Sequence, residues 1–185
     1  MKVGILGSGD VAKALAAGFV KHGHQVTLGT RDPVKLKDFL AQHQGAHARS
    51  FADAAKFGGV VVLAVKGTVA LDALKAAGAA NLAGKPVIDA TNPIADAPPT
   101  NGVLKFFTNL DQSLMEQLQK AFLDAHFVKA YNSVGNARMI NPEFPGGAKP
   151  TMFICGNDDK AKSVVRGVPA CRSHRPSCSS PASSL

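Results

Sequence analysis

The stretch KVGILGSGDVA, residues 2–12, decides how this chain folds. Its apolar run ends at a glycine, and the spacing Gly7-x-Gly9-x-x-Ala12 follows at the start of a helix-like segment. Gly7 permits a tight turn, Gly9 lets a pyrophosphate approach the backbone, and the small Ala12 lets the helix pack close to the strand. The spacing therefore predicts a strand, a turn whose N–H groups bind a dinucleotide, and a helix. A tight turn that binds nothing is the alternative.

Strand and helix patterns alternate along most of the chain. Strands are expected at 24–29, 46–50, 60–65, 85–90, 126–131 and 151–156, and helices at 10–23, 33–41, 68–78, 113–124 and 158–165. The run VVVLAV at 60–65 is continuously apolar, which is typical of a strand buried on both faces of a parallel sheet. We therefore predict an α/β fold of the Rossmann type, a doubly wound and mainly parallel sheet with helices on both faces.

The end of the chain breaks this alternation. From residue 166 the sequence is rich in Ser, Pro, Arg and Cys and has no periodicity, so it offers little apolar surface to offset the entropy of ordering. A chain of 185 residues is long enough for one well-buried domain. We expect an NAD(P)-binding Rossmann domain over 1–165 and an atypical, flexible C-terminal tail over 166–185.

The charge distribution bears on possible partners. The net charge is +8, but five of the 21 basic residues and none of the 13 acidic ones lie from Lys160 onward. The remainder is only mildly basic and has no stripe of Lys and Arg with interleaved aromatic residues, so we expect no nucleic-acid partner.

Membrane and metal sites are also not expected from the sequence. No apolar run approaches the roughly 20 residues that span a bilayer, and the N-terminus lacks the pattern of a signal peptide, so a cytoplasmic protein is expected. Cys155, Cys171 and Cys178 match no zinc spacing, which predicts reduced thiols and no metal site.

The stretch TLGTRDP, residues 27–33, indicates which dinucleotide binds. NAD sites often carry Asp or Glu at the end of the second strand, where the carboxylate binds the ribose hydroxyls and would repel an added 2′-phosphate. Here Thr30 and Arg31 offer a hydroxyl and a guanidinium fork that suits phosphate oxygens, and Lys35 adds a second positive charge. These residues predict a preference for NADP. In the alternative, Arg31 is solvated and paired with Asp32 or Asp38, or Asp32 itself reaches the ribose.

Several motifs in order resemble one known family. GILGSGDVAKALAAGFVKHGHQVTLGTRDP, LAVKG, VIDATNP and FVKAYNSVGN together are similar to the NADP-dependent, deazaflavin-coenzyme (coenzyme F420) oxidoreductases. Their bacterial members, known as predicted dinucleotide-binding oxidoreductases, are the closer likeness. The resemblance runs from Met1 to about Val165. It departs from the family at Lys66, where deazaflavin enzymes tend to have proline, and from Gly167 onward.

The resemblance implies a set of site residues. Pyrophosphate contacts fall on Ser8, Gly9, Asp10 and Val11, and 2′-phosphate contacts fall on Thr30, Arg31 and Lys35. The path from adenosine to nicotinamide is lined by Ala64, Val65 and Val69, and the nicotinamide end lies at Asn92. Asn132 and Ser133 would edge the substrate-side cleft where a redox partner stacks. In the alternative reading, Asn92 caps a turn before Pro93 and Asn132 satisfies loop backbone.

The resemblance also implies the chemistry, a hydride passed between nicotinamide and a flat flavin- or deazaflavin-like small molecule. A hydride step requires no general acid or base, so no catalytic residue is expected, and Tyr131 is predicted to be a packed ring rather than an acid. A homodimer is a further expectation. One alternative is a non-catalytic NADP(H)-binding or sensor module. Another is a hydroxyacid or imine reductase, which would need a proton donor in the cleft, and Lys66 is the candidate.

Overall fold

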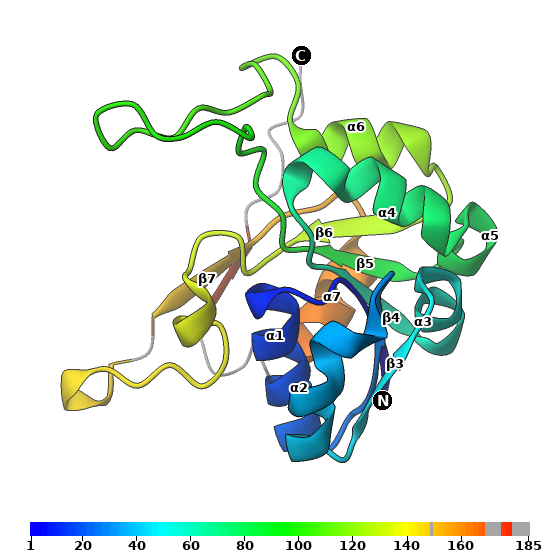
Figure 1. Ribbon diagram of the computed structural model, residues 1–185. Coiled ribbons are helices and arrows are strands. Elements are labelled where there is room, and N and C mark those ends of the chain that lie inside the picture. The colour runs from blue at the N-terminus through cyan, green and yellow to red at the C-terminus, as the bar shows by residue number, and fades with distance from the viewer. Residues whose placement is uncertain (149, 169–174, 179–185) are drawn as a thin grey trace.

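Six parallel strands form the central sheet, in the order β3-β2-β1-β4-β5-β6 (Figure 1). The structure, a computed structural model, describes residues 1–148 and 150–168 and the backbone of 175–178. The strands are β1 (Lys2–Leu6), β2 (Gln25–Gly29), β3 (Ala46–Arg49), β4 (Val60–Leu63), β5 (Pro86–Asp89), β6 (His126–Lys129), β7 (Thr151–Ile154) and β8 (Arg175–Cys178). This strand order confirms the predicted Rossmann-type fold.

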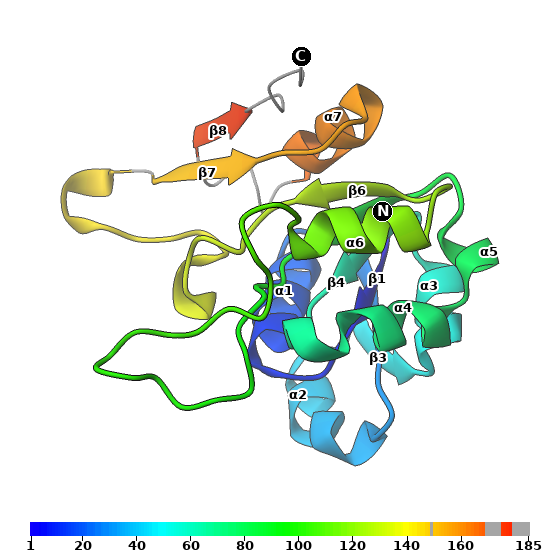
Figure 2. The ribbon, with the colours of Figure 1, turned by 90° about the horizontal axis from the view of Figure 1, so that it is seen from above.

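Helices cover both faces of the sheet (Figures 1 and 2). The α-helices are α1 (Asp10–Lys21), α2 (Lys37–Gln42), α3 (Phe51–Phe57), α4 (Ala70–Ala77), α5 (Ala79–Leu82), α6 (Leu114–Ala121) and α7 (Asp159–Gly167). Short 3-10 helices are η1 (Pro33–Leu36), η2 (Gly67–Val69), η3 (Asn136–Arg138) and η4 (Pro145–Gly147).

The core has two parts because successive residues of a strand point to opposite faces. Val60 and Val62 of β4 pack in one buried cluster with α1 and α7, whereas Val61 and Leu63 pack in the other with α3, α4 and α6. This double burial explains the absence of alternation in the β4 sequence. Tyr131 is fully buried, as predicted for a packed ring.

The topology places a crevice at the centre of the sheet edge. β1 pairs in parallel with β2 through Lys2↔Gln25 and with β4 through Val3↔Val60. The connection that leaves β1 runs toward β2, whereas the connection that leaves β4 runs toward β5, so the loops at the carboxyl ends of β1 and β4 separate. Ligands bind in this position in doubly wound sheets.

The last strands lie outside the main sheet. β7 pairs in parallel with β8 and not with a strand of the main sheet, and Cys155, the residue after β7, forms an antiparallel bridge with Lys129 of β6. Within the expected tail, Arg166 and Gly167 belong to α7, and residues 175–178 form β8. Residues 169–174 and 179–185, Cys171 among them, lie outside the described residues, as does the side chain of Cys178.

The described part of the chain lacks two features. It holds no helix with the length and apolar character needed to cross a bilayer. Nor does it bring three His, Cys, Asp or Glu side chains together as a metal ion would require.

The packing of α3 on β1 generates a stability prediction. A Cβ on Gly4 would lie 2.1 Å from the carbonyl oxygen of Ala54, so Gly4→Ala forces helix and strand apart. We expect a loss of about 1–3 kcal/mol in the free energy of unfolding, measured in urea. Gly59→Ala is the matched control, because its Cβ meets only the Lys2 oxygen at 3.9 Å. Equal stability of the two variants would contradict this close approach.

Candidate functional site

A cleft of about 1050 Å³ opens at the carboxyl ends of the central strands. Nine of the residues implicated by the sequence line it: Ser8, Gly9, Asp10, Val11, Arg31, Ala64, Val65, Val69 and Asn92. Gly7, Thr30, Lys35, Asn132 and Ser133 are not among the lining residues. The fold thus brings together residues from four separate loops, each of which follows a strand of the sheet.

The turn after β1 has the shape that its glycines predict. Gly7 has a φ of +140°, and a Cβ there would lie 2.3 Å from the Ala64 oxygen, so this position requires glycine. A Cβ on Gly9, in contrast, would meet no atom within 4 Å, since this residue faces open space in the cleft. The backbone is therefore exposed at the point where a pyrophosphate would approach.

Helix α1 begins at this turn without a side-chain cap. Gly9 is its N-cap residue and has no side chain that accepts a bond from the first turn. The first N–H groups of an α-helix have no partner within the helix, and they carry the positive end of its dipole. At residues 10 and 11, which line the cleft, these groups form a site suited to an anion.

In the loop after β2, Asp32 and Arg31 have different surroundings. Asp32 is the N-cap of η1, where its Oδ1 accepts a bond from Val34 N at 3.1 Å and its Oδ2 lies 3.8 Å from Lys35 Nζ. Arg31 is exposed, lines the cleft, and has no ion pair or hydrogen bond to any described residue. The guanidinium is therefore not paired with Asp32 or Asp38 in the described part of the chain.

Thr30 and Lys35, the other two residues expected to contact the 2′-phosphate, do not line the cleft. The Thr30 hydroxyl is 3.2 Å from Ser8 Oγ and accepts a bond from Asp32 N at 3.1 Å, so it connects the β1 and β2 turns. Lys35, whose side chain is 69% exposed, extends from η1 outside the lining of the cleft. Thr30 thus fixes the loop, and Arg31 is the cation that this loop presents to the cleft.

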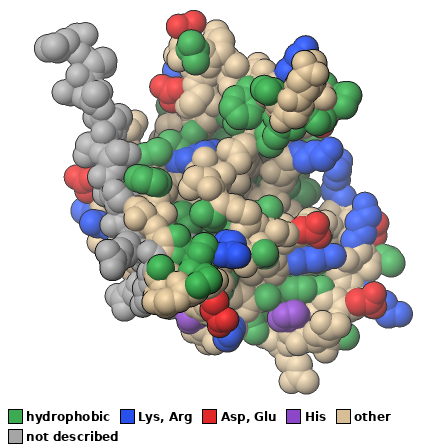
Figure 3. Space-filling model, turned by 90° about the vertical axis from the view of Figure 1, so that its left-hand side faces the viewer, with side chains coloured by type: hydrophobic (Ala, Val, Ile, Leu, Met, Phe, Trp, Pro, Cys, Tyr) green, Lys and Arg blue, Asp and Glu red, His purple; other side chains and the backbone are tan. Residues whose placement is uncertain are grey.

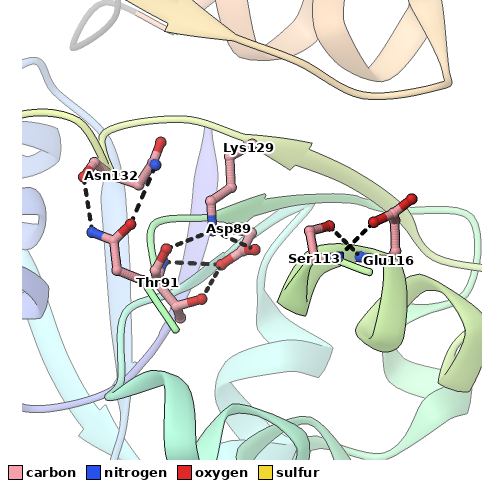
Figure 4. Close-up of polar contacts among 7 residues, drawn as sticks. Asp89, Thr91, Ser113, Glu116, Lys129 and Asn132 are labelled. Carbon is pink, nitrogen blue, oxygen red and sulfur yellow. Dashed lines mark hydrogen bonds and ion pairs between the residues drawn. The ribbon is translucent and has the colours of Figure 1, made fainter. Parts of the chain in front are cut away.

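The loops after β4, β5 and β6 meet at Asn92. A Cβ on Gly67 would lie 2.2 Å from the Asn92 oxygen, so the β4 turn requires glycine here. Asn92 Nδ2 donates to the backbone oxygen of Asn132 at 2.9 Å, and Asn132 Nδ2 lies 3.4 Å from Asn92 Oδ1 (Figure 4). Ser133 is exposed beside this pair. The Asn92 side chain therefore joins two loops while the residue lines the cleft.

A buried ion pair next to Asn92 was missed by the sequence analysis. Asp89, fully buried at the end of β5, pairs with Lys129 at the end of β6, and the Nζ–Oδ2 distance is 2.9 Å. The signal in the sequence was a charged residue within an apolar strand pattern, in PVID and again in HFVK. Register, which places Asp89 directly opposite Lys129, cannot be read from either pattern alone.

One wall of the cleft comes from an arm, residues 93–107, that projects from the sheet edge (Figures 1 and 2). An antiparallel bridge between Ile94 and Phe106 closes its base. Several of its apolar side chains are exposed, namely Ile94, Val103, Leu104, Phe106 and Phe107. Viewed from the side toward which the arm projects, the surface carries hydrophobic side chains close to Lys and Arg side chains (Figure 3).

One ion pair joins the arm to the β4 turn. Lys66, in the β4 turn, forms an ion pair with Asp96 of the arm at 3.4 Å, and both residues line the cleft. Farther along the chain, Ser113 and Glu116 form a capping box at the start of α6. The bond from Ser113 N lowers the pKa of Glu116, so the box is formed at neutral pH and weakens only as the pH falls into the acid range.

Comparisons with known proteins agree with this geometry. The family model for NADP oxidoreductases that depend on coenzyme F420 matches residues 2–93. A candidate F420-dependent NADP reductase from Arthrobacter sp. FB24 is 33% identical, with a TM-score of 0.89, over 98% of this chain and 84% of that one. No curated protein matches significantly.

More distant structures share the fold. A hypothetical protein from Sinorhizobium meliloti is 23% identical, with a TM-score of 0.81, over 97% of this chain and 84% of that one. Plasmodium falciparum pyrroline carboxylate reductase, solved with NADP bound, is 14% identical, with a TM-score of 0.65, over 97% and 57%. The Arthrobacter match, together with the family model, establishes that this chain belongs to the coenzyme F420-dependent NADP oxidoreductase family, whose members are NADP-dependent oxidoreductases.

Proposed function

We propose that this chain binds NADP(H) in the cleft and transfers a hydride between nicotinamide and a flavin- or deazaflavin-like molecule. The observation that carries the proposal is the uncapped start of α1 beside Gly9, with Arg31 at the neighbouring loop of the same cleft. This arrangement is suited to bind a dinucleotide with an additional phosphate on its adenosine ribose.

The two ends of the cleft have different chemistry, which gives the cofactor its direction. The N–H groups of Asp10 and Val11 hold the pyrophosphate, and the Arg31 guanidinium holds the 2′-phosphate. Ala64, Val65 and Val69 border the path toward the loop of Asn92, where the nicotinamide lies. Nicotinamide supplies the hydride chemistry when it is bound. The chain contributes orientation and the exclusion of water, and needs no residue that moves a proton.

The region beyond Asn92 is suited to bind a flat, partly apolar redox partner. Asn132, which is bonded to Asn92, and its neighbour Ser133 would edge this region, and the arm forms a wall of the same cleft. Exposed aromatic and aliphatic side chains beside a cleft are suited to stack on a planar ring. The matching family is named for coenzyme F420, a deazaflavin, so we expect a deazaflavin before any other planar ring as the redox partner.

Reduction of a carbon–nitrogen double bond is the second candidate. Such a reaction needs a proton donor next to the hydride acceptor, and Lys66 and Asp96 lie in the cleft as a pair of titratable groups. The side chains of this pair are 80% and 62% exposed, so both are open to solvent and to a substrate.

The acceptor is tested by turnover of NADPH without oxygen. The full chain is mixed with NADPH and, in separate assays, with a deazaflavin, FMN or a cyclic imine, and the absorbance of NADPH is followed. We expect oxidation with the deazaflavin or FMN, and the same rate in Lys66→Met. Oxidation only with the imine, abolished in Lys66→Met, would favour the second candidate. Tight binding without oxidation by any acceptor would mean a binding or sensor module.

Arg31 is tested by the preference between the two dinucleotides. Fluorescence titration of wild type should give at least tenfold tighter binding of NADPH than of NADH, which is about 1.4 kcal/mol. Arg31→Gln should remove this preference by weakening NADPH binding alone. Lys37→Gln, an exposed neighbour outside the cleft, is the charge-matched control and should keep the preference. An unchanged preference in Arg31→Gln would place the 2′-phosphate elsewhere.

Gly9 is tested by filling the open space over the turn. In Gly9→Val the side chain meets no protein atom within 4 Å of its Cβ, so the free energy of unfolding should stay within about 0.5 kcal/mol of wild type. The same methyl groups occupy the place of the pyrophosphate, and NADPH affinity should fall by more than about tenfold. Gly135→Val, whose Cβ is equally unobstructed outside the cleft, is the control. Normal NADPH binding by Gly9→Val would contradict the proposed pose.

A further inference from the structure

The Asp89–Lys129 pair lies deep in the sheet edge, and neither residue lines the cleft. The Asp89 side chain is fully buried, and that of Lys129 is only 16% exposed. Burying two charges costs free energy that their attraction does not reliably repay, so such a pair is weak evidence for stability. The neighbouring groups to which these two charges bind indicate what the pair does.

Both charges bind the same residue of the cleft wall. Asp89 Oδ1 accepts bonds from Thr91 N at 2.9 Å and from Thr91 Oγ1 at 2.7 Å, while Lys129 Nζ donates to the Thr91 carbonyl oxygen (Figure 4). The N–H, the carbonyl and the hydroxyl of Thr91 are therefore all bound by one ion pair. Thr91 is 2% exposed and lines the cleft. These bonds restrict the rotation of its peptide groups while the pair is intact.

This constraint passes to Asn92, the next residue along the chain. Asn92 is also joined to Asn132 by its side chain and touches the β4 turn at Gly67 through its carbonyl. Loops from three strands thus converge on one residue at the nicotinamide end of the cleft. Among the described residues, the side-chain bonds of the pair stay within Asp89, Thr91 and Lys129 and do not reach the Gly9 turn or Arg31 at the other end.

We propose that Asp89 and Lys129 are positioning residues that hold Thr91 and Asn92 in the one arrangement that orients the nicotinamide ring for hydride transfer. The proposal rests on the proposed function, because it takes the cofactor to lie with its nicotinamide at Asn92. It goes further in assigning the orientation of that ring to a buried ion pair whose two residues do not line the cleft. Small displacements of a reacting ring lower rates strongly, whereas the binding of the remainder of the cofactor is unaffected.

The test measures contact with each end of the cofactor separately. Saturation-transfer NMR with NADP⁺ compares the signal of the nicotinamide protons with that of the adenine protons. The variant combines Asp89→Asn with Lys129→Met, which removes both charges together and leaves no unpaired buried charge. We expect the nicotinamide-to-adenine ratio to fall by at least half, while the Kd for NADP⁺ changes by less than about threefold.

A second ion pair of the chain provides the control. Lys162 and Asp159 of α7 lie 2.8 Å apart, with the Lys162 side chain 5% exposed, and neither residue lines the cleft. Asp159→Asn with Lys162→Met should leave the ratio unchanged. If the Asp89 and Lys129 double variant does not fold, Thr91→Val removes one bond of the same network and should lower the ratio in the same direction.

The outcomes separate this inference from the proposed function. An unchanged ratio in a folded variant, or an equal loss of both signals, overturns the role of the ion pair even though NADP⁺ binds. Absence of NADP⁺ binding by wild type overturns the proposed function and, with it, the inference. A loss confined to the nicotinamide protons, absent from the α7 control, supports both.

Discussion

The candidate site depends on the parallel pairing of β1 with β2 on one side and with β4 on the other. The connection that leaves β1 runs toward β2 and the one that leaves β4 runs toward β5, so the two diverge and a crevice opens between β1 and β4. The pairing also fixes the distance between the β1 turn and β4, where a Cβ on Gly7 would strike the Ala64 oxygen at 2.3 Å. The start of α1, Arg31 and the loops of Ala64 and Asn92 reach one cleft because of that pairing.

The parts of the fold that the sequence could predict are those with a local physical cause. Gly7 and Gly9 predict the turn because the need for glycine is local: it comes from the backbone conformation and from the close approach of a ligand within a few residues. β4 can be predicted from the sequence because a strand buried on both faces must be apolar throughout. The position of β7 was beyond such reasoning, since its pattern matches the other strands and only its partners reveal that it leaves the main sheet.

Long-range contacts account for what was missed at the site. Asp89 and Lys129 are 40 residues apart, and nothing in PVID or HFVK says that these strand ends share a register position. The arm reads as a loop rich in Pro, Asn and Gly, and its place beside the cleft follows only from where β5 ends. Arg31 was identified because its position directly after a strand has a known geometric meaning in this fold.

We propose that one NADP(H) molecule lies across this crevice in a single direction, and the first measurement to make is a crystal structure of the chain with NADP⁺ bound. We expect the 2′-phosphate within hydrogen-bond distance of the Arg31 guanidinium. We also expect the pyrophosphate over Gly9 and the nicotinamide ring at Asn92. A cofactor bound in the reverse direction, or a 2′-phosphate in solvent with Asp32 on the ribose, would show that the proposed direction is wrong.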